Sequence, residues 1–299
     1  MFFSLTSAAL LMLAGLFWLE PRLVYIPTPL AGARYATTPA DMGIPYERLE
    51  LTTADGTNIV SWLLVHEDTD QPEDTDQPED TDQPESTEAN QTRPYVMYFH
   101  GNGSNLPGYL ALCAVLYELG ANVLMLEYRG YGESGGSPSE QGLYQDAKTA
   151  YDALRARGVS PEQIVLYGFS LGTGVATYLA SQVDVGGVML EAPFTSLPAA
   201  ARAAYGPLTP TFLMRNRFDS LERIDNINAP LMVMHASDDR IIPVAQGKQL
   251  FDAAHEPKTF VTMSGDHNTL VSDLPDDTIK QAWRDFLTDI AAQKLPSAP

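Results

Sequence analysis

Cysteine, basic residues and metal-binding patterns are scarce in this 299-residue sequence. The single cysteine, Cys113, excludes an internal disulfide framework and a cysteine-rich zinc site. With 18 Lys and Arg against 38 Asp and Glu, the formal net charge is −20, which argues against a nucleic-acid partner because binding needs bases to neutralise phosphates. The five histidines show neither HExxH nor HxxxH spacing, so we expect no metal and no other cofactor.

Residues 2–19 form an uncharged, apolar run of 18 residues. As a helix this run would rise about 27 Å, close to the hydrocarbon thickness of a bilayer. A cleaved signal peptide is one alternative, but no basic residue precedes the run, and Ala31-Gly32-Ala33 comes too late for cleavage. A buried core helix is the other alternative, although the run shows no polar face. We therefore predict a membrane anchor at 1–22 and a membrane location, with the side left open, followed by one domain over 23–299.

Residues 67–92 form an acidic segment in which the hexapeptide Glu-Asp-Thr-Asp-Gln-Pro occurs three times in succession. Acids and prolines offer no apolar face to bury, and a long surface insertion costs little free energy of loop closure. We predict a disordered loop insertion, with an acidic interaction segment as the alternative. The segment holds eleven acids and no base, so the rest of the chain has 38 − 11 = 27 acids against 18 bases, or a charge of −9.

Outside these two segments, apolar strands alternate with helices. The pattern predicts an antiparallel hairpin at the start, from strands 46–51 and 58–65. Further strands are predicted at 95–99, 122–127, 164–167, 187–190, 231–235 and 258–262, with helices at 106–119, 138–157, 171–182, 244–254 and 275–292. Such alternation is typical of an α/β fold, in which helices cover both faces of a mostly parallel sheet.

The pattern G-x-S-x-G, which surrounds the nucleophile of many serine hydrolases, occurs twice, at 168–172 and 132–136. A serine nucleophile needs a strand directly before it and a helix directly after it, since this tight turn exposes the hydroxyl and leaves room only for glycine beside it. Ser170 has that context. Ser134 is followed by Gly-Gly-Ser-Pro, which is typical of a loop. We predict Ser170 as the nucleophile and Ser134 as part of the loop structure.

A serine hydroxyl is a weak nucleophile and needs a base. Three histidines follow Ser170 in the chain. His235 lies in an apolar strand and His255 ends a helix, whereas His267 lies in a loop directly after a strand. Because catalytic side chains gather in the loops after the carboxyl ends of parallel strands, His267 is the predicted general base.

The base in turn needs a carboxylate to orient it. In hydrolases with this serine turn the acid follows the nucleophile and precedes the histidine in the chain. Two acids, Asp238 and Asp239, follow the strand 231–235, and the spacing to the next Ile-Ile-Pro favours Asp239. Glu191, at the end of another strand, is a weaker candidate.

Acyl transfer also needs two N–H donors for the oxyanion. The backbone of Leu171, directly after the nucleophile, is the first prediction, and Asn102 in His100-Gly101-Asn102-Gly103 is the second. Phe169, Phe194 and Phe212 are the predicted substrate-binding residues, with the last two in the apolar stretch between 191 and 230. Ordinary packing of two short helices is the alternative for that stretch.

Six motifs in the same order over residues 45–292 resemble the α/β-hydrolase superfamily. They are 100–103, 128–132, 168–172, 191–196, 239–243 and His267. The chain looks most like the membrane-anchored branch with a short lid, which includes lysophospholipase-like proteins and protein depalmitoylases. The resemblance implies an eight-stranded sheet and a Ser-Asp-His triad. Two features depart from the family. The loop at 100–103 is not the His-Gly-Gly-Gly of many lipases, which disfavours lipase substrates, and the acidic repeat is not part of the family pattern.

The sequence therefore predicts a serine hydrolase that cleaves a small-molecule carboxylic ester or thioester through an acyl-enzyme, and that is bound to a membrane through residues 2–19. An aminopeptidase-like amidase with the same triad is the first alternative. A non-catalytic membrane scaffold that presents the acidic loop is the second.

Overall fold

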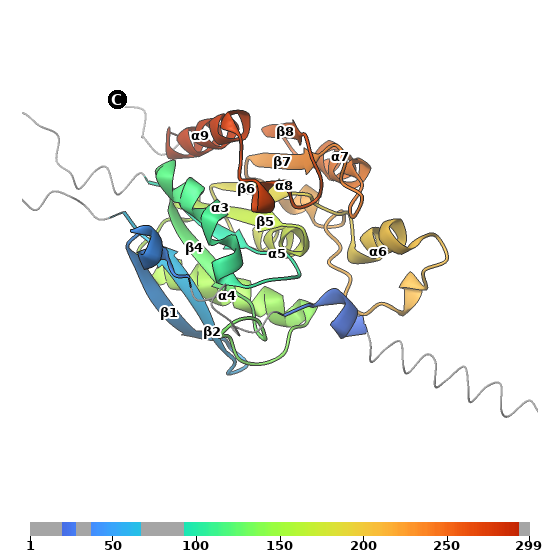
Figure 1. Cartoon of the computed structure of the whole chain (residues 1–299), viewed down its shortest axis with the longest axis horizontal. Coiled ribbons are helices and arrows are strands. Elements are labelled where there is room, and N and C mark those ends of the chain that lie inside the picture. The colour runs from blue at the N-terminus through green and yellow to red at the C-terminus, as the bar shows by residue number, and fades with distance from the viewer. Residues whose placement is uncertain (1–19, 28–36, 67–92, 293–299) are drawn as a thin grey trace, which may run out of the picture.

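The computed structural model describes residues 20–27, 37–66 and 93–292 (Figure 1). Residues 1–19 of the predicted anchor at 1–22 and the acidic repeat at 67–92 lie outside these ranges. Within them, no helix is long and apolar enough to span a bilayer.

The core of the domain is one eight-stranded sheet with the strand order β1-β2-β4-β3-β5-β6-β7-β8. The strands are β1 (Tyr46–Thr52), β2 (Asn58–Leu64), β3 (Tyr95–Phe99), β4 (Asn122–Glu127), β5 (Ile164–Phe169), β6 (Gly187–Glu191), β7 (Leu231–Ala236) and β8 (Lys258–Met263). The β1–β2 hairpin is antiparallel and joins β4 antiparallel, while the strands from β4 to β8 are parallel. The predicted mostly parallel sheet is confirmed.

Helices cover both faces of the sheet (Figure 1). One face carries α4, α5 and α7, and the other carries α3 and α9. The helices are α3 (Leu106–Glu118), α4 (Glu140–Ala156), α5 (Leu171–Ala180), α6 (Leu197–Tyr205), α7 (Val244–Ala253), α8 (Thr269–Ser272) and α9 (Asp277–Ala292), with short 3₁₀ turns η2 (Pro39–Met42), η3 (Pro161–Gln163), η4 (Thr211–Leu213) and η5 (Ile224–Asn226). Because helices lie on both sides, every residue of the central strands β4, β5 and β6 is buried, as the continuous apolar runs predict.

Parallel strands end at the same edge of a sheet, so the loops after β3, β5, β7 and β8 meet there. These loops carry Asn102, Ser170, Asp239 and His267. The connection from β6 to β7 contains α6 and η4 and lies over the same edge. The fold therefore gathers the predicted site residues from segments that are up to 165 residues apart in the chain, from 102 to 267.

Candidate active site

Ser170 lies in a strained turn between β5 and α5. Its backbone has φ +49° and ψ −115°, a conformation that costs a non-glycine residue free energy and that is typical of functional turns. The chain passes so closely here that a Cβ on Gly172 would lie 2.0 Å from the Phe99 carbonyl oxygen, and one on Gly168 would lie 2.5 Å from the Gly172 oxygen. The Ser170 N–H donates to the Glu191 carbonyl at the end of β6 (2.9 Å). Neither Gly168 nor Gly172 thus has room for a side chain.

The predicted nucleophile, base and acid form one chain of hydrogen bonds. Ser170 Oγ lies 2.9 Å from His267 Nε2, and His267 Nδ1 lies 2.7 Å from Asp239 Oδ2. A carboxylate only accepts, so Nδ1 carries the proton and Nε2 is left to accept from the serine hydroxyl. The alternative acid, Asp238, is exposed. This arrangement leaves the imidazole ready to take the serine proton.

Several donors hold Asp239 in its ionised form. Burial by itself would raise the pKa of this carboxyl, but hydrogen bonds from His235 and His267 and from the Ile242 backbone outweigh it and keep the pKa well below its ordinary value. The other carboxylate oxygen, Oδ1, accepts from the N–H groups of Ile241 (2.9 Å) and Ile242 (2.8 Å). His235, predicted to be structural, is fully buried, and its Nε2–H is shared between the Ile242 carbonyl (2.8 Å) and Asp239 Oδ2 (3.4 Å).

A second carboxyl, Glu191, lies at the end of the adjacent strand β6 and behaves in the opposite way. It is 1% exposed, and its Oε2 accepts from the Tyr167 hydroxyl (2.7 Å). Burial is the main cause that raises its pKa to about 8, and the charge of Asp239 adds to the rise. Two carboxyls at neighbouring strand ends are therefore kept in different protonation states, with Asp239 ionised and Glu191 neutral at pH 7.

The loop after β3 is held in place around Asn102. The Asn102 carbonyl accepts from the Tyr131 hydroxyl (2.9 Å) and from the Ile26 N–H (3.0 Å). The preceding carbonyl, Gly101 O, lies 2.7 Å from His100 Nδ1. In a trans peptide the N–H points opposite to the carbonyl, so fixing Gly101 O also fixes the direction of the Asn102 N–H. Asn102 lines the same cavity as Ser170 and Leu171.

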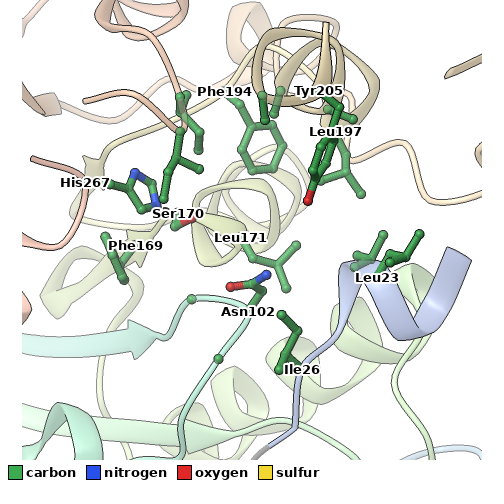
Figure 2. Close-up of a pocket in the computed structure, with 18 of the residues that line it drawn as sticks. Leu23, Ile26, Asn102, Phe169, Ser170, Leu171, Phe194, Leu197, Tyr205 and His267 are labelled. Carbon is green, nitrogen blue, oxygen red and sulfur yellow. Dashed lines mark hydrogen bonds between the residues drawn. The ribbon is translucent and has the colours of Figure 1, made fainter. Parts of the chain in front are cut away.

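A cavity of about 860 Å³ opens at Ser170 and His267 (Figure 2). Its walls are mainly apolar and come from the loop after β3, from α6 and η4, and from the N-terminal turn. Phe169 and Phe194 line it and are almost fully buried, and their contact with a substrate stays a prediction. Phe212 does not line the cavity and its side chain is 81% exposed, although its neighbours Leu213 and Met214 line it.

The N-terminal turn, residues 20–26, forms a wall that the sequence did not predict. Leu23 and Ile26 face α6 across the cavity (Figure 2). Glu20 anchors the turn, since one carboxylate oxygen accepts from the backbone N–H groups of Arg215 (2.8 Å) and Asn216 (2.9 Å). The sequence signal was slight: one acid, Glu20, directly after the apolar run.

Other candidates have ordinary structural surroundings. Ser134 Oγ donates to the Glu127 carbonyl (2.8 Å) and accepts from the Val60 N–H (2.9 Å), as predicted for a loop serine. His255 is exposed and bonds the Asp225 carbonyl. Over residues 20–27, 37–66 and 93–292, His, Cys, Asp and Glu form no group of three that would hold a metal ion.

Comparison with known proteins agrees with this fold. Residues 90–216 match a hydrolase family described as serine aminopeptidase, S33. A Mycobacterium tuberculosis protein of uncharacterised activity is 32% identical over 275 residues, which cover 91% of this chain and 88% of that protein. The Danio rerio lysophosphatidylserine lipase ABHD12 is 35% identical over 188 residues, 56% of this chain and only about half (49%) of that lipase.

Among solved structures, the Pyrococcus furiosus esterase Pf2001 superposes with a TM-score of 0.67 at 20% identity, over 88% of this chain and 98% of the esterase. At that identity the likeness speaks for the fold alone. The fold, the family match and the near full-length relative together show that this chain is a hydrolase and belongs to the α/β-hydrolase superfamily.

Proposed function

We propose that this protein cleaves a carboxylic ester or thioester through an acyl-enzyme on Ser170. The observation that carries the proposal is the hydrogen-bonded chain Ser170–His267–Asp239, whose serine opens into a cavity with mainly apolar walls. A nucleophile with a base and an orienting acid is the arrangement that acyl transfer needs, and apolar walls suit an acyl chain.

In the first half of the reaction, Ser170 Oγ forms a bond to the acyl carbon while His267 Nε2 takes the hydroxyl proton. Asp239 holds the Nδ1 proton and stabilises the imidazolium. The tetrahedral intermediate then breaks its bond to the leaving alcohol or thiol, which receives the proton from Nε2. The product is the acyl-Ser170 ester.

In the second half, water gives a proton to His267 Nε2 and its oxygen attacks the acyl carbon. The bond to Ser170 Oγ breaks, the serine regains a proton from His267, and the carboxylic acid leaves. In both halves the negative oxygen accepts from the N–H groups of Leu171 and Asn102. Leu171 is the first residue of α5, so the positive end of the helix dipole adds to this stabilisation.

An aminopeptidase-like amidase is a second candidate, because the matched family carries the description serine aminopeptidase. The apolar cavity favours the ester or thioester, and the name of the Danio rerio relative points in the same direction. Turnover of p-nitrophenyl esters of increasing acyl length, measured against aminoacyl anilides, separates the two candidates.

We also propose that residues 2–19 anchor the protein in a membrane and that 67–92 is a disordered insertion between β2 and β3. Support for the anchor is the uncharged apolar run itself. Support for the insertion is its acidic repeat, which lies between two paired strands of the described sheet.

The direct test is labelling with a fluorophosphonate probe, which reacts with an activated serine. Wild type and Ser134→Ala are expected to label, and Ser170→Ala is not. Ester turnover by Ser170→Ala should fall about 10⁴- to 10⁶-fold, as for other serine hydrolases that lose the nucleophile. Equal labelling of Ser170→Ala and wild type would contradict the mechanism.

A further inference from the structure

The mouth of the cavity is surrounded by exposed apolar side chains. Over the described ranges, eight large hydrophobic residues are exposed, and six of them lie on the cavity or directly beside residues that line it. We name these six the apolar rim: Leu23, Ile26, Tyr205, Leu208, Phe212 and Ile241. They come from the N-terminal turn, from the α6–η4 segment and from the loop after β7, so tertiary structure gathers them at one site.

The exposure within the rim is unusually high for residues of this kind. Leu208 is 95% exposed, Phe212 is 81% exposed and Tyr205 is 78% exposed. Single exposed apolar residues are common, but a group of them around a cavity is typical of a surface that meets an apolar partner. The rim also leads directly to the cavity that contains Ser170.

The charge of the rim segment differs from that of the rest of the chain. Residues 192–218 contain no Asp or Glu and three arginines, although acids outnumber bases by 38 to 18 overall. Arg215 and Arg217, whose side chains are 43% and 49% exposed, pair with Glu20 (3.1 Å) and Asp219 (3.3 Å), whereas Arg202 is exposed and donates to the Thr211 hydroxyl (2.7 Å). Basic residues beside exposed apolar ones are the combination that binds an anionic lipid surface.

Glu20, the first described residue after the apolar run 2–19, lies beside the apolar rim. Glu20 lines the cavity and is bonded to the backbone of Arg215 and Asn216, so the apolar run 2–19 joins the domain at the rim. The N-terminal turn and α6 lie on the same side of the molecule in Figure 1. An anchor in the bilayer would therefore bring the rim to the membrane surface.

We propose that the apolar rim docks on the surface of an anionic lipid bilayer, so that an acyl substrate passes from the lipid into the cavity without crossing water. This inference rests on the proposed anchor and deepens the proposed function by naming the source of the substrate. It requires that the tips of Leu208 and Phe212 lie in the bilayer interface while the opposite side of the domain stays in water.

The native cysteine, Cys113, is fully buried, so a thiol-reactive dye should label only a cysteine introduced at the surface of the full chain. Leu208→Cys and Phe212→Cys would each be labelled with the environment-sensitive dye NBD and bound to vesicles of phosphatidylcholine and phosphatidylglycerol. Met42→Cys is the matched control, since Met42 is an exposed hydrophobic residue (47%) in η2, away from the rim. We expect blue-shifted emission and quenching by nitroxide-labelled lipids at 208 and 212, and water-like emission at 42.

Two results would overturn the proposal. The first is a chain that floats with the vesicles while NBD at 208 and 212 emits as it does at 42. The second is equal quenching on vesicles of phosphatidylcholine alone, which would remove the role of anionic lipid. Because the dye reports position and not turnover, this test stands even if the enzyme fails to cleave any ester.

Activity provides an independent measurement. Leu208→Glu adds a charge at a side chain that does not line the cavity. We expect it to lower turnover of a long-chain ester embedded in vesicles about tenfold or more and to leave turnover of soluble p-nitrophenyl acetate unchanged. Met42→Glu should change neither rate. Equal losses of both rates in Leu208→Glu, or no loss of either, would contradict docking, whereas a wild type inactive on both esters would contradict the proposed function.

Discussion

The turns at 132–136 and 168–172 carry the same G-x-S-x-G pattern, yet their serines bond differently. Ser134 Oγ bridges two strands, because it donates to the Glu127 carbonyl of β4 and accepts from the Val60 N–H of β2. Ser170 Oγ bonds a side chain, His267 Nε2. The Ser134 hydroxyl adds a link between the backbones of β2 and β4, whereas the Ser170 hydroxyl faces the cavity.

The backbone explains this difference. Ser170 has φ +49° and stands between a strand and a helix, so its side chain is forced out of the turn and its N–H returns to β6. Ser134 follows a hydrogen-bonded turn, in which its own N–H donates to the Tyr131 carbonyl (2.8 Å), and its side chain folds back on the sheet. The five-residue pattern therefore has meaning only together with the elements on either side.

The largest effect is expected from alanine at the last glycine of the Ser170 turn. In Gly172→Ala the new Cβ would lie 2.0 Å from the Phe99 oxygen and 2.8 Å from the His100 oxygen, both backbone atoms that cannot turn aside. We expect it to lower the free energy of unfolding by more than about 3 kcal/mol. Thermal denaturation measures this change.

Gly136→Ala is the matched control in the Ser134 turn. There the new Cβ would come closest to the Thr57 side chain (Cγ2, 2.8 Å), whose end can move, and would lie at ordinary contact distance from Arg129 Cβ (3.7 Å), so the remaining cost comes from φ +78°. That cost is about 1–2 kcal/mol. A Gly136→Ala protein as unstable as Gly172→Ala would show that the two turns are equally constrained and would break the comparison.

Much of this contrast could be predicted from the sequence, because the strand–serine–helix order and the glycines act locally. Asp239 and His267 could also be predicted from the sequence, since both follow strands that end at the same edge of the sheet. The wall made by residues 20–26 was not, because it depends on bonds from Glu20 to Arg215 and from Ile26 to Asn102 that join distant segments. The outward direction of the Phe212 side chain could not be predicted either, because an apolar residue in an apolar stretch gives no sign of which way it points.

A smaller, pH-dependent effect is expected from Glu191, which lies behind the Ser170 turn. Its folded-state pKa of about 8 exceeds the ordinary 4.5, so between these values the folded protein holds a proton that the unfolded chain has lost. This stability is fully present below pH 4.5 and is lost as pH rises toward 8, at up to about 1.4 kcal/mol per pH unit. Glu191→Gln should remove that slope in urea denaturation between pH 5 and 8.

The control for Glu191 is Glu133→Gln in the other turn. Glu133 is 47% exposed and pairs with Arg48 on the surface, and such a pair contributes only about 0–1 kcal/mol. Glu133→Gln should therefore leave the pH dependence of the free energy of unfolding as in wild type. A wild-type slope in Glu191→Gln as well would mean that another group takes up the proton.

The smallest effect is expected from Ser134→Ala, which tests whether the second pattern is purely structural. The change leaves the buried Val60 N–H without its acceptor and the Glu127 carbonyl without this donor, so the free energy of unfolding should fall by about 1–3 kcal/mol. Ester turnover and fluorophosphonate labelling should stay at the wild-type level, since Ser134 lies outside the residues that line the cavity. Replacement by threonine, which keeps a hydroxyl, should restore part of the lost stability. A loss of turnover in Ser134→Ala at a temperature where the protein remains folded would instead assign this serine to the reaction, and the distinction between the two turns would fail.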